Sequence, residues 1–193
     1  MIGPVREIKS LLTLLVLALC PGLGCSSDSR TPAEGTPEAA AEAAAPLPTI
    51  YFKDLAPFLP EKLEGFTHSG TEGSTGKYGE VSISEAERTF IRGEDREVKV
   101  RIVDTTLGGK IAKSIRAAAE DAKRKPESDP TAPIFWDAAV GFVRYDPSEV
   151  TAEANLLVGD RYVVAVTSRG FPGTVEVRRV ARGIDLAGLA RLR

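Results

Sequence analysis

A strict alternation of apolar and charged residues most constrains what this chain can fold into. Val98, Val100 and Ile102 alternate with charged neighbours within residues 96–104, which is typical of a strand buried on one face. Four further strands are predicted between turn residues, at 81–91, 139–145, 150–158 and 162–168. The connections between neighbouring segments are short, and short connections join antiparallel strands. We therefore expect an antiparallel sheet.

Two segments have the helical period instead. One apolar stripe runs from Ile111 to Ala122, with charged residues on the other sides, and Pro126 ends it. A second stripe runs from Val177 to Ile184, after which we expect Asp185 to cap a last helical turn. The predicted fold class is α+β, an antiparallel β-sheet covered by two main helices.

The parts between these elements have weaker patterns. Residues 54–60 predict one or two helical turns limited by prolines, and residues 65–79 predict a glycine-rich connection with a strand that starts at Phe66. The glycines at 70, 73, 76 and 79 do not fit a phosphate-binding P-loop, because Tyr78 stands where that loop needs Ser or Thr, so a mobile loop is favoured. A polar loop is expected through Pro133, with Phe135-Trp136 in packing contacts or, alternatively, as a ligand platform.

Residues 1–24 have the three-part layout of an export signal. Arg6 and Lys9 charge the front, residues 11–20 form an apolar run, and the Pro-Gly segment 21–24 breaks any helix. About ten apolar residues span roughly 15 Å as a helix, which is half of a bilayer core of about 30 Å. We therefore expect this segment to be removed rather than to remain as a membrane span.

The end of this segment, Gly22-Leu23-Gly24-Cys25, resembles the lipobox of bacterial lipoproteins. The resemblance implies that a peptidase cuts after Gly24 and that the thiol of Cys25 carries diacylglycerol, with a further acyl chain such as palmitate often added to the new amine. Two or more acyl chains anchor a protein durably, whereas one chain is marginal. The alternative interpretation is an ordinary signal peptide followed by an incidental cysteine.

Composition divides the remaining chain into a linker and a domain. Residues 25–49 comprise the lipidated Cys25 and a segment rich in Ala, Pro and Glu, which is too poor in large apolar residues to fold, so we expect a disordered linker. Residues 50–193 are the expected globular domain. The net charge of −2, with acids and bases interspersed, gives no reason to expect a nucleic-acid partner.

The residues that would support catalysis or metal binding are sparse. The chain has one histidine, His68, and no cysteine after Cys25, so neither an activated nucleophile nor a zinc site is expected. We expect His68 to be a surface residue, the protein not to be an enzyme, and no cofactor. Acidic pairs brought together by folding are the alternative left open.

Basic residues gather on the last helices. They give this part of the chain a basic side that is a candidate for binding anionic lipid or glycan, although favourable interaction with a helix C-terminus accounts for such a stripe by itself and is the favoured interpretation. The residues are Arg178, Arg179, Arg182, Arg191 and Arg193.

Several short segments across residues 55–193 look like an uncharacterised family of exported bacterial domains. They are Leu59-Pro60 with Leu63, Gly65 and Phe66; residues 84–87; Val100, Ile102 and Asp104; residues 156–161; and residues 184–186. The order of strands and helices is also similar to the α/β sandwich of the PsbP family. Neither resemblance implies a catalytic residue.

These observations predict a lipid-anchored cell-envelope protein whose domain is a binding or interaction module. Its expected partners are the bilayer, through acylated Cys25, and either another envelope protein or an anionic lipid. Ser26 after the cysteine is similar to lipoproteins sent to the outer membrane, so the domain is expected to face the periplasm or the cell surface. The alternative is a periplasmic carrier in which the helices leave an apolar cavity over the sheet, and an enzyme is the third possibility.

Overall fold

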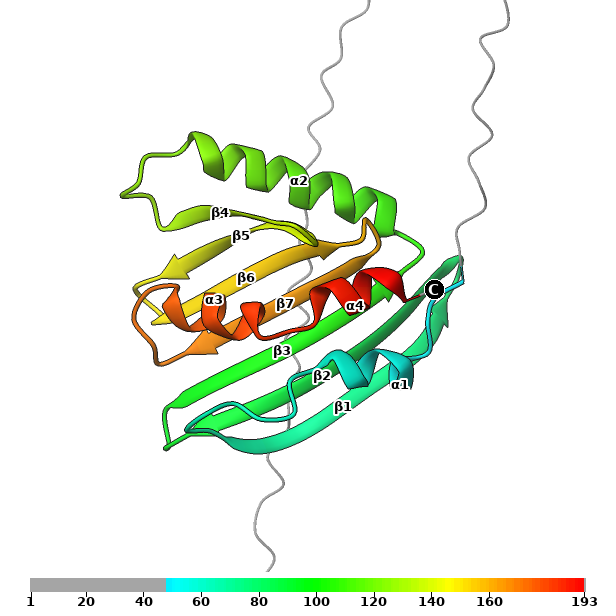
Figure 1. The fold of residues 1–193 in the computed structure, drawn as a ribbon, viewed down its shortest axis with the longest axis horizontal. Coiled ribbons are helices and arrows are strands. Elements are labelled where there is room, and N and C mark those ends of the chain that lie inside the picture. The colour runs from blue at the N-terminus through cyan, green and yellow to red at the C-terminus, as the bar shows by residue number, and fades with distance from the viewer. Residues whose placement is uncertain (1–47, 193) are drawn as a thin grey trace, which may run out of the picture. The chain divides into compact units, whose positions relative to one another are not determined.

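The computed structural model describes residues 48–192, which form one seven-stranded antiparallel sheet with helices on both faces (Figure 1). The strand order is β1-β2-β3-β7-β6-β5-β4. The strands are β1 (Thr67–Tyr78), β2 (Val81–Arg92), β3 (Arg96–Thr105), β4 (Thr131–Trp136), β5 (Ala139–Asp146), β6 (Thr151–Val158) and β7 (Tyr162–Arg169). The helices are α1 (Phe52–Leu55), α2 (Gly108–Arg124), α3 (Val175–Arg182) and α4 (Leu186–Arg191), and a 3₁₀ turn, η1 (Ala56–Phe58), follows α1.

The predicted α+β class is confirmed, and so are the five strands expected from sequence periodicity. Their ends agree within one residue with β2, β3, β5, β6 and β7. The two apolar stripes form α2 and α3, and the Asp185 side chain caps α4 by accepting a hydrogen bond from the Gly188 N–H at 2.8 Å. The short helices α1 and α4 fall where helical turns were expected, so the sheet is covered by four α-helices and not by two main helices alone.

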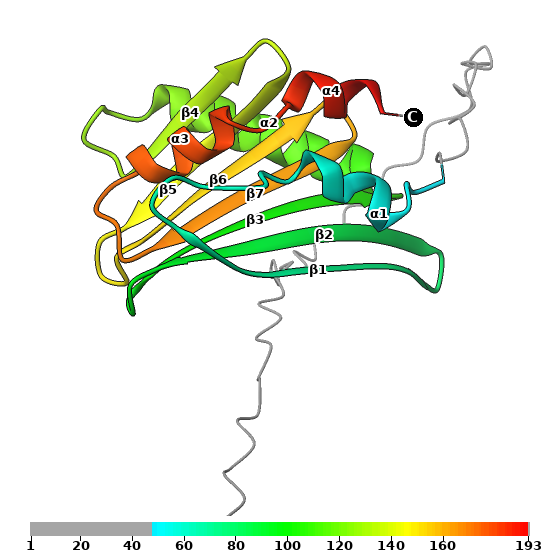
Figure 2. The ribbon, with the colours of Figure 1, turned by 60° about the horizontal axis from the view of Figure 1, so that its bottom comes forward.

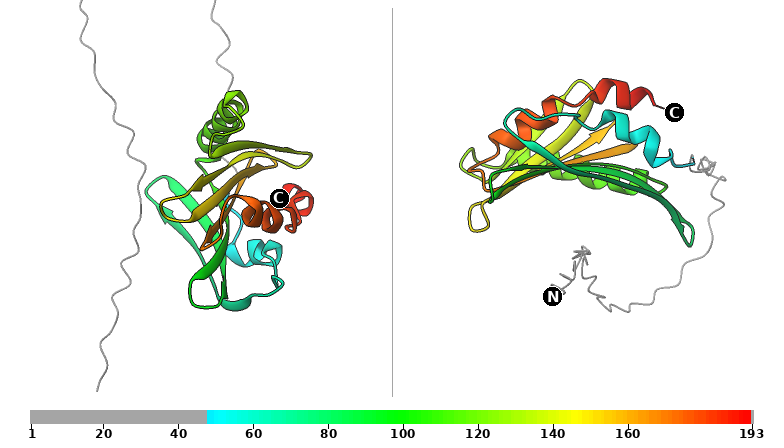
Figure 3. Two further views of the ribbon diagram at one scale, coloured as in Figure 1. Left: turned by 90° about the vertical axis from the view of Figure 1, so that its left-hand side faces the viewer. Right: turned by 90° about the horizontal axis from the view of Figure 1, so that it is seen from below.

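One face of the sheet, which we call the core face, carries most of the buried apolar side chains. On β3, Val98, Val100 and Ile102 are fully buried there, as the alternation predicts. Helices α1, α3 and α4 lie over this face, and Figures 2 and 3 show all three on the same side of the sheet. From α3 and α4, Val177 and Leu189 complete the core. Burial of this one face accounts for the period of two in the strands.

The opposite face is covered only in part. Ala112 and Ile115 of α2 pack on Leu157 of β6, which points away from the core face because its two neighbours point into it. Over β2 and β3 this face instead carries charged side chains that pair across strands. Glu87 lies 3.3 Å from the Lys99 ammonium and 2.7 Å from the Arg101 guanidinium. The sheet therefore has one apolar face and one face that is half solvated.

The strand predicted to start at Phe66 is confirmed within one residue, but it includes the whole glycine-rich segment before β2, so the prediction of a mobile loop there is wrong. All of Thr67–Tyr78 belongs to β1, which pairs along its length with β2 with one irregularity near His68. Gly73 allows this arrangement, because a Cβ atom there would stand 2.3 Å from the Phe52 ring of α1. The Phe52 N–H also donates to the Thr75 hydroxyl at 2.9 Å. Contacts with α1 thus compensate for the low strand propensity of glycine.

The polar loop predicted through Pro133 is also wrong, because Thr131–Trp136 forms strand β4. This strand lies at the edge of the sheet, next to β5 alone. Proline is tolerated in edge strands, since one side of such a strand forms no ladder hydrogen bonds. The side chains of Phe135 and Trp136 consequently point to opposite faces.

Candidate functional site

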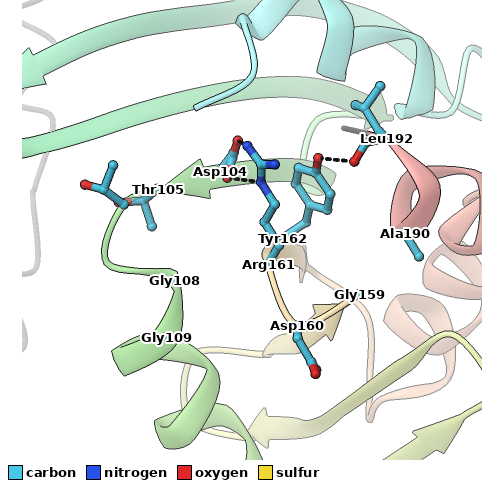
Figure 4. Close-up of a pocket in the computed structure, with 11 residues that line it drawn as sticks. Asp104, Thr105, Gly108, Gly109, Gly159, Asp160, Arg161, Tyr162, Ala190 and Leu192 are labelled. Atoms are coloured by element: carbon cyan, nitrogen blue, oxygen red, sulfur yellow. Dashed lines mark hydrogen bonds and ion pairs between the residues drawn. The ribbon is translucent and has the colours of Figure 1, made fainter. Parts of the chain in front are cut away.

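An open cavity of about 370 Å³ lies at one corner of the sheet (Figure 4). The end of β3, the turn between β6 and β7, the start of α2 and the end of α4 meet there. In that turn Gly159 and Asp160 both have positive φ, 56° and 59°, which suits a tight hairpin turn. The turn brings Arg161 to the start of β7, beside the cavity.

Arg161 forms a two-pronged ion pair with Asp104 of β3. Its Nε and Nη2 atoms donate to the two carboxylate oxygens at 3.0 and 2.7 Å. The Asp104 side chain is only 2 % exposed, and that of Arg161 is 19 % exposed. The hydrogen bonds to Asp104 raise the pKa of Arg161, with burial acting in the opposite direction. The pair is therefore largely buried and well matched in geometry.

The same two side chains hold the beginning of the described chain. The Ile50 N–H donates to Asp104 Oδ2 at 2.7 Å, and Arg161 donates to the Pro48 carbonyl at 2.7 Å. The adjacent Tyr162 holds the other end, since its hydroxyl donates to the Leu192 carbonyl at 2.8 Å. We call Asp104, Arg161 and Tyr162 the corner clasp.

The corner clasp has no group free for acid–base chemistry. Both carboxylate oxygens of Asp104 already accept hydrogen bonds, and burial raises the pKa of Tyr162, so its hydroxyl stays protonated at neutral pH. A general base must instead be within reach of a substrate proton and able to accept it. The arrangement joins both ends of the domain to the sheet and has no catalytic geometry.

His68 lies on exposed β1, as predicted for a surface residue. Its Nε2 atom is 3.0 Å from the Thr71 hydroxyl, and its ring lies beside the ring of Phe90. Within residues 48–192, no three His, Cys, Asp or Glu side chains are grouped closely enough to hold a metal ion.

No family model, curated protein or solved structure matches this chain. The resemblances to lipoproteins, to an exported bacterial family and to the PsbP fold remain predictions. The function must therefore be argued from the residues of this protein themselves.

The structure separates the five arginines that the sequence groups together. Arg179 forms an ion pair with Glu176 of the same helix at 2.5 Å, which raises the pKa of Arg179. Arg191 is exposed on α4, and Arg193 lies outside the described residues. Arg178 and Arg182 remain, one helical turn apart on α3, and we call them the arginine pair.

The arginine pair has no acidic partner among residues 48–192. No carboxylate of the described chain lies within ion-pair distance of either residue, whereas Arg179 of the same helix is paired with Glu176. The Arg182 guanidinium instead stands over the Trp136 ring of β4, 5.5 Å from its centre. Burial of Arg178 and, second, the charge of Arg182 lower the pKa of Arg178. Two like charges one turn apart repel each other, so this surface favours an anion.

The anchor residues predicted from sequence, Gly24 and Cys25, lie outside the described residues. Between residues 48 and 192, no helix has both the length and the apolar character required to cross a membrane.

The corner clasp was missed by the sequence interpretation, although one signal for it was present. The alternation that buries Val98, Val100 and Ile102 continues to Asp104, which places a carboxylate on the core face. A buried carboxylate needs a positive partner, but no local pattern identifies Arg161, because 57 positions separate the two residues.

Proposed function

We propose that this chain is a lipid-anchored protein of a bacterial cell envelope. Support for the anchor comes from Gly22-Leu23-Gly24-Cys25 after an apolar run of about ten residues, which matches the pattern of an export signal cut before a lipidated cysteine. The domain follows at residue 50 and is held at the outer membrane, facing the periplasm or the cell surface.

The domain acts as a binding or interaction module, and the arginine pair is the observation that carries this proposal. Neither guanidinium group has an acidic partner within residues 48–192, Arg178 is partly buried, and Arg182 stands over the Trp136 ring. Arg178 is half-buried and Arg182 is exposed, and neither has an ion pair with a described carboxylate, whereas Arg179 of the same helix is paired with Glu176. Arg178 and Arg182 instead fit an anionic group supplied by a partner.

Packing favours this module over a carrier of an apolar ligand. A carrier needs space between the helices and the core face. In that layer Val177 and Leu189 from the helices, and Leu156 and Val164 from the strands, are fully buried against one another. The cavity at the corner of the sheet is open, and charged residues line it together with Ala190 and Leu192, whereas a carrier of an apolar ligand needs an enclosed apolar space.

The anchor is tested by substitution of Cys25. We expect Cys25→Ser to abolish incorporation of labelled palmitate and to move the protein from the membrane fraction to the soluble fraction, because the acylated thiol is gone. Cys20→Ser is the matched control, since Cys20 lies within the segment that is expected to be removed, and it should remain labelled and membrane-bound. Continued sedimentation of the Cys25→Ser protein with membranes would contradict the anchor.

A further inference from the structure

We infer that the arginine pair and Trp136 form a docking site for an anionic membrane surface, and that the domain lies with its core-face helices toward the membrane that holds its anchor. This inference rests on the proposed function for the identity of that membrane. The site itself is argued from the domain alone.

The chemistry of the site fits phosphate-bearing lipid headgroups. A guanidinium presents paired N–H donors that match two phosphate oxygens. Arg178 and Arg182 present two such groups one turn apart, with no carboxylate of the described chain competing for them. Tryptophan is favoured at membrane interfaces because its ring is apolar while its indole N–H is polar. Trp136 is partly buried beneath Arg182, so headgroup contact would change its surroundings.

The position of the linker is compatible with this orientation. Residues 48–50 are held at the corner clasp, and Ile50 packs against the core that α3 and α4 cover. Helices α1, α3 and α4 lie on one side of the sheet (Figure 3). The chain between Cys25 and Pro48 can reach at most about 80 Å. An anchored domain is therefore always near the bilayer, and its α3 side can turn toward it.

The expected strength of membrane binding by the arginine pair suits an anchored protein. A basic residue near an anionic surface strengthens binding about fivefold, so the pair contributes a factor of about 30. Such a contribution gives an unanchored protein only weak membrane binding, which a titration to high lipid concentration can measure. It is sufficient to orient a domain whose linker already keeps it at high effective concentration.

The test uses residues 25–193 with Cys25→Ser, so that neither a signal segment nor a lipid is present. Binding is measured by co-sedimentation with phosphatidylcholine vesicles, with and without phosphatidylglycerol. We expect binding to require the anionic lipid and to weaken as salt rises. Arg178→Gln/Arg182→Gln should lower it by an order of magnitude or more. The matched control is Arg116→Gln/Arg144→Gln, which removes the same charge from α2 and β5 and should change binding less than about threefold.

Trp136 supplies a second readout, because it is the only tryptophan of the chain. We expect anionic vesicles to shift its emission and to protect it from a soluble quencher. Equal loss of binding in both double variants would show that only net charge matters and would overturn the site. Unchanged Trp136 emission in the bound protein would overturn it as well. Release by glycerol phosphate at constant ionic strength would overturn the membrane assignment in favour of a soluble phosphate ester.

The two proposals fail separately. The vesicle experiment uses a protein without an anchor, so its outcome does not depend on lipidation of Cys25. Retention of the Cys25→Ser protein in the cell membrane fraction would contradict the proposed anchor but not the docking site. Equal vesicle binding by the arginine-pair variant and the control double variant would contradict the docking site but not the anchor. Circular dichroism of each double variant confirms that it is folded.

Discussion

Replacement of Arg161 by methionine tests whether the corner clasp holds the domain together. The substitution keeps much of the aliphatic volume but removes both hydrogen bonds to Asp104 and the one to Pro48. The Asp104 carboxylate, which is 2 % exposed, would keep only the Ile50 N–H as a partner. A buried charge without its counter-ion is strongly unfavourable in the folded state.

The structure indicates how much unfolding free energy Arg161→Met should lose. Breaking a buried ion pair by removing one partner costs about 3–5 kcal/mol. Arg161 is 19 % exposed, so some water reaches the site and we expect the lower end, about 3 kcal/mol. Domains of this size have unfolding free energies of about 5–15 kcal/mol. The melting temperature should fall by on the order of 10 °C.

Equilibrium urea unfolding at neutral pH, followed by circular dichroism, measures this difference. The control is Arg116→Met, which breaks the exposed ion pair with Asp160 near the same corner and should cost less than about 1 kcal/mol. The double variant Asp104→Asn/Arg161→Met should lose less than the sum of the two single losses, because no unpaired charge remains. Additive losses, or a loss below about 1 kcal/mol for Arg161→Met, would refute the reasoning.

Three further substitutions have defined outcomes in the same unfolding assay. Gly141→Ala should destabilise the domain by about 1–3 kcal/mol, because a Cβ there would stand 2.0 Å from the Asn155 carbonyl oxygen, and unchanged stability would contradict that contact. Asp185→Ala should cost about 1 kcal/mol through loss of the α4 cap. Burial raises the pKa of Tyr162 above its usual 10.0, so its neutral form stabilises the fold below that pH and this contribution falls as pH rises further. Tyr162→Phe removes the hydrogen bond to Leu192 and should lower the free energy of unfolding by about 1 kcal/mol at neutral pH. Above pH 10, the stability of this variant should decline less than that of the wild type.

The elements predicted correctly are those whose own residues carry a strong period. Strand β3 alternates because one of its faces is buried, and α2 has its stripe because one side packs on Leu157. The extent of β1 and the strand β4 were not predicted, for the opposite reason. The first is glycine-rich and exposed, and Pro133 interrupts the second, so neighbouring elements rather than propensity hold them in the sheet.

The candidate sites divide in the same way. The five arginines were visible as a basic group, but the sequence alone does not show that Glu176 pairs with Arg179 or that Arg182 stands over Trp136. The first contact depends on rotamers within one helix turn. The second joins α3 to an edge strand about forty positions away, so it follows from the order of the strands.

The α+β class, the antiparallel direction of neighbouring strands and the buried face of each strand could be predicted from the residues alone, because they follow from local periodicity and short turns. Only the tertiary structure decided that β3 lies beside β7. Because β3 and β7 are neighbours, Asp104 meets Arg161, and the corner clasp can hydrogen-bond to Pro48 and to Leu192. Long-range pairing depends on how all the apolar faces are buried together, and no single segment encodes it.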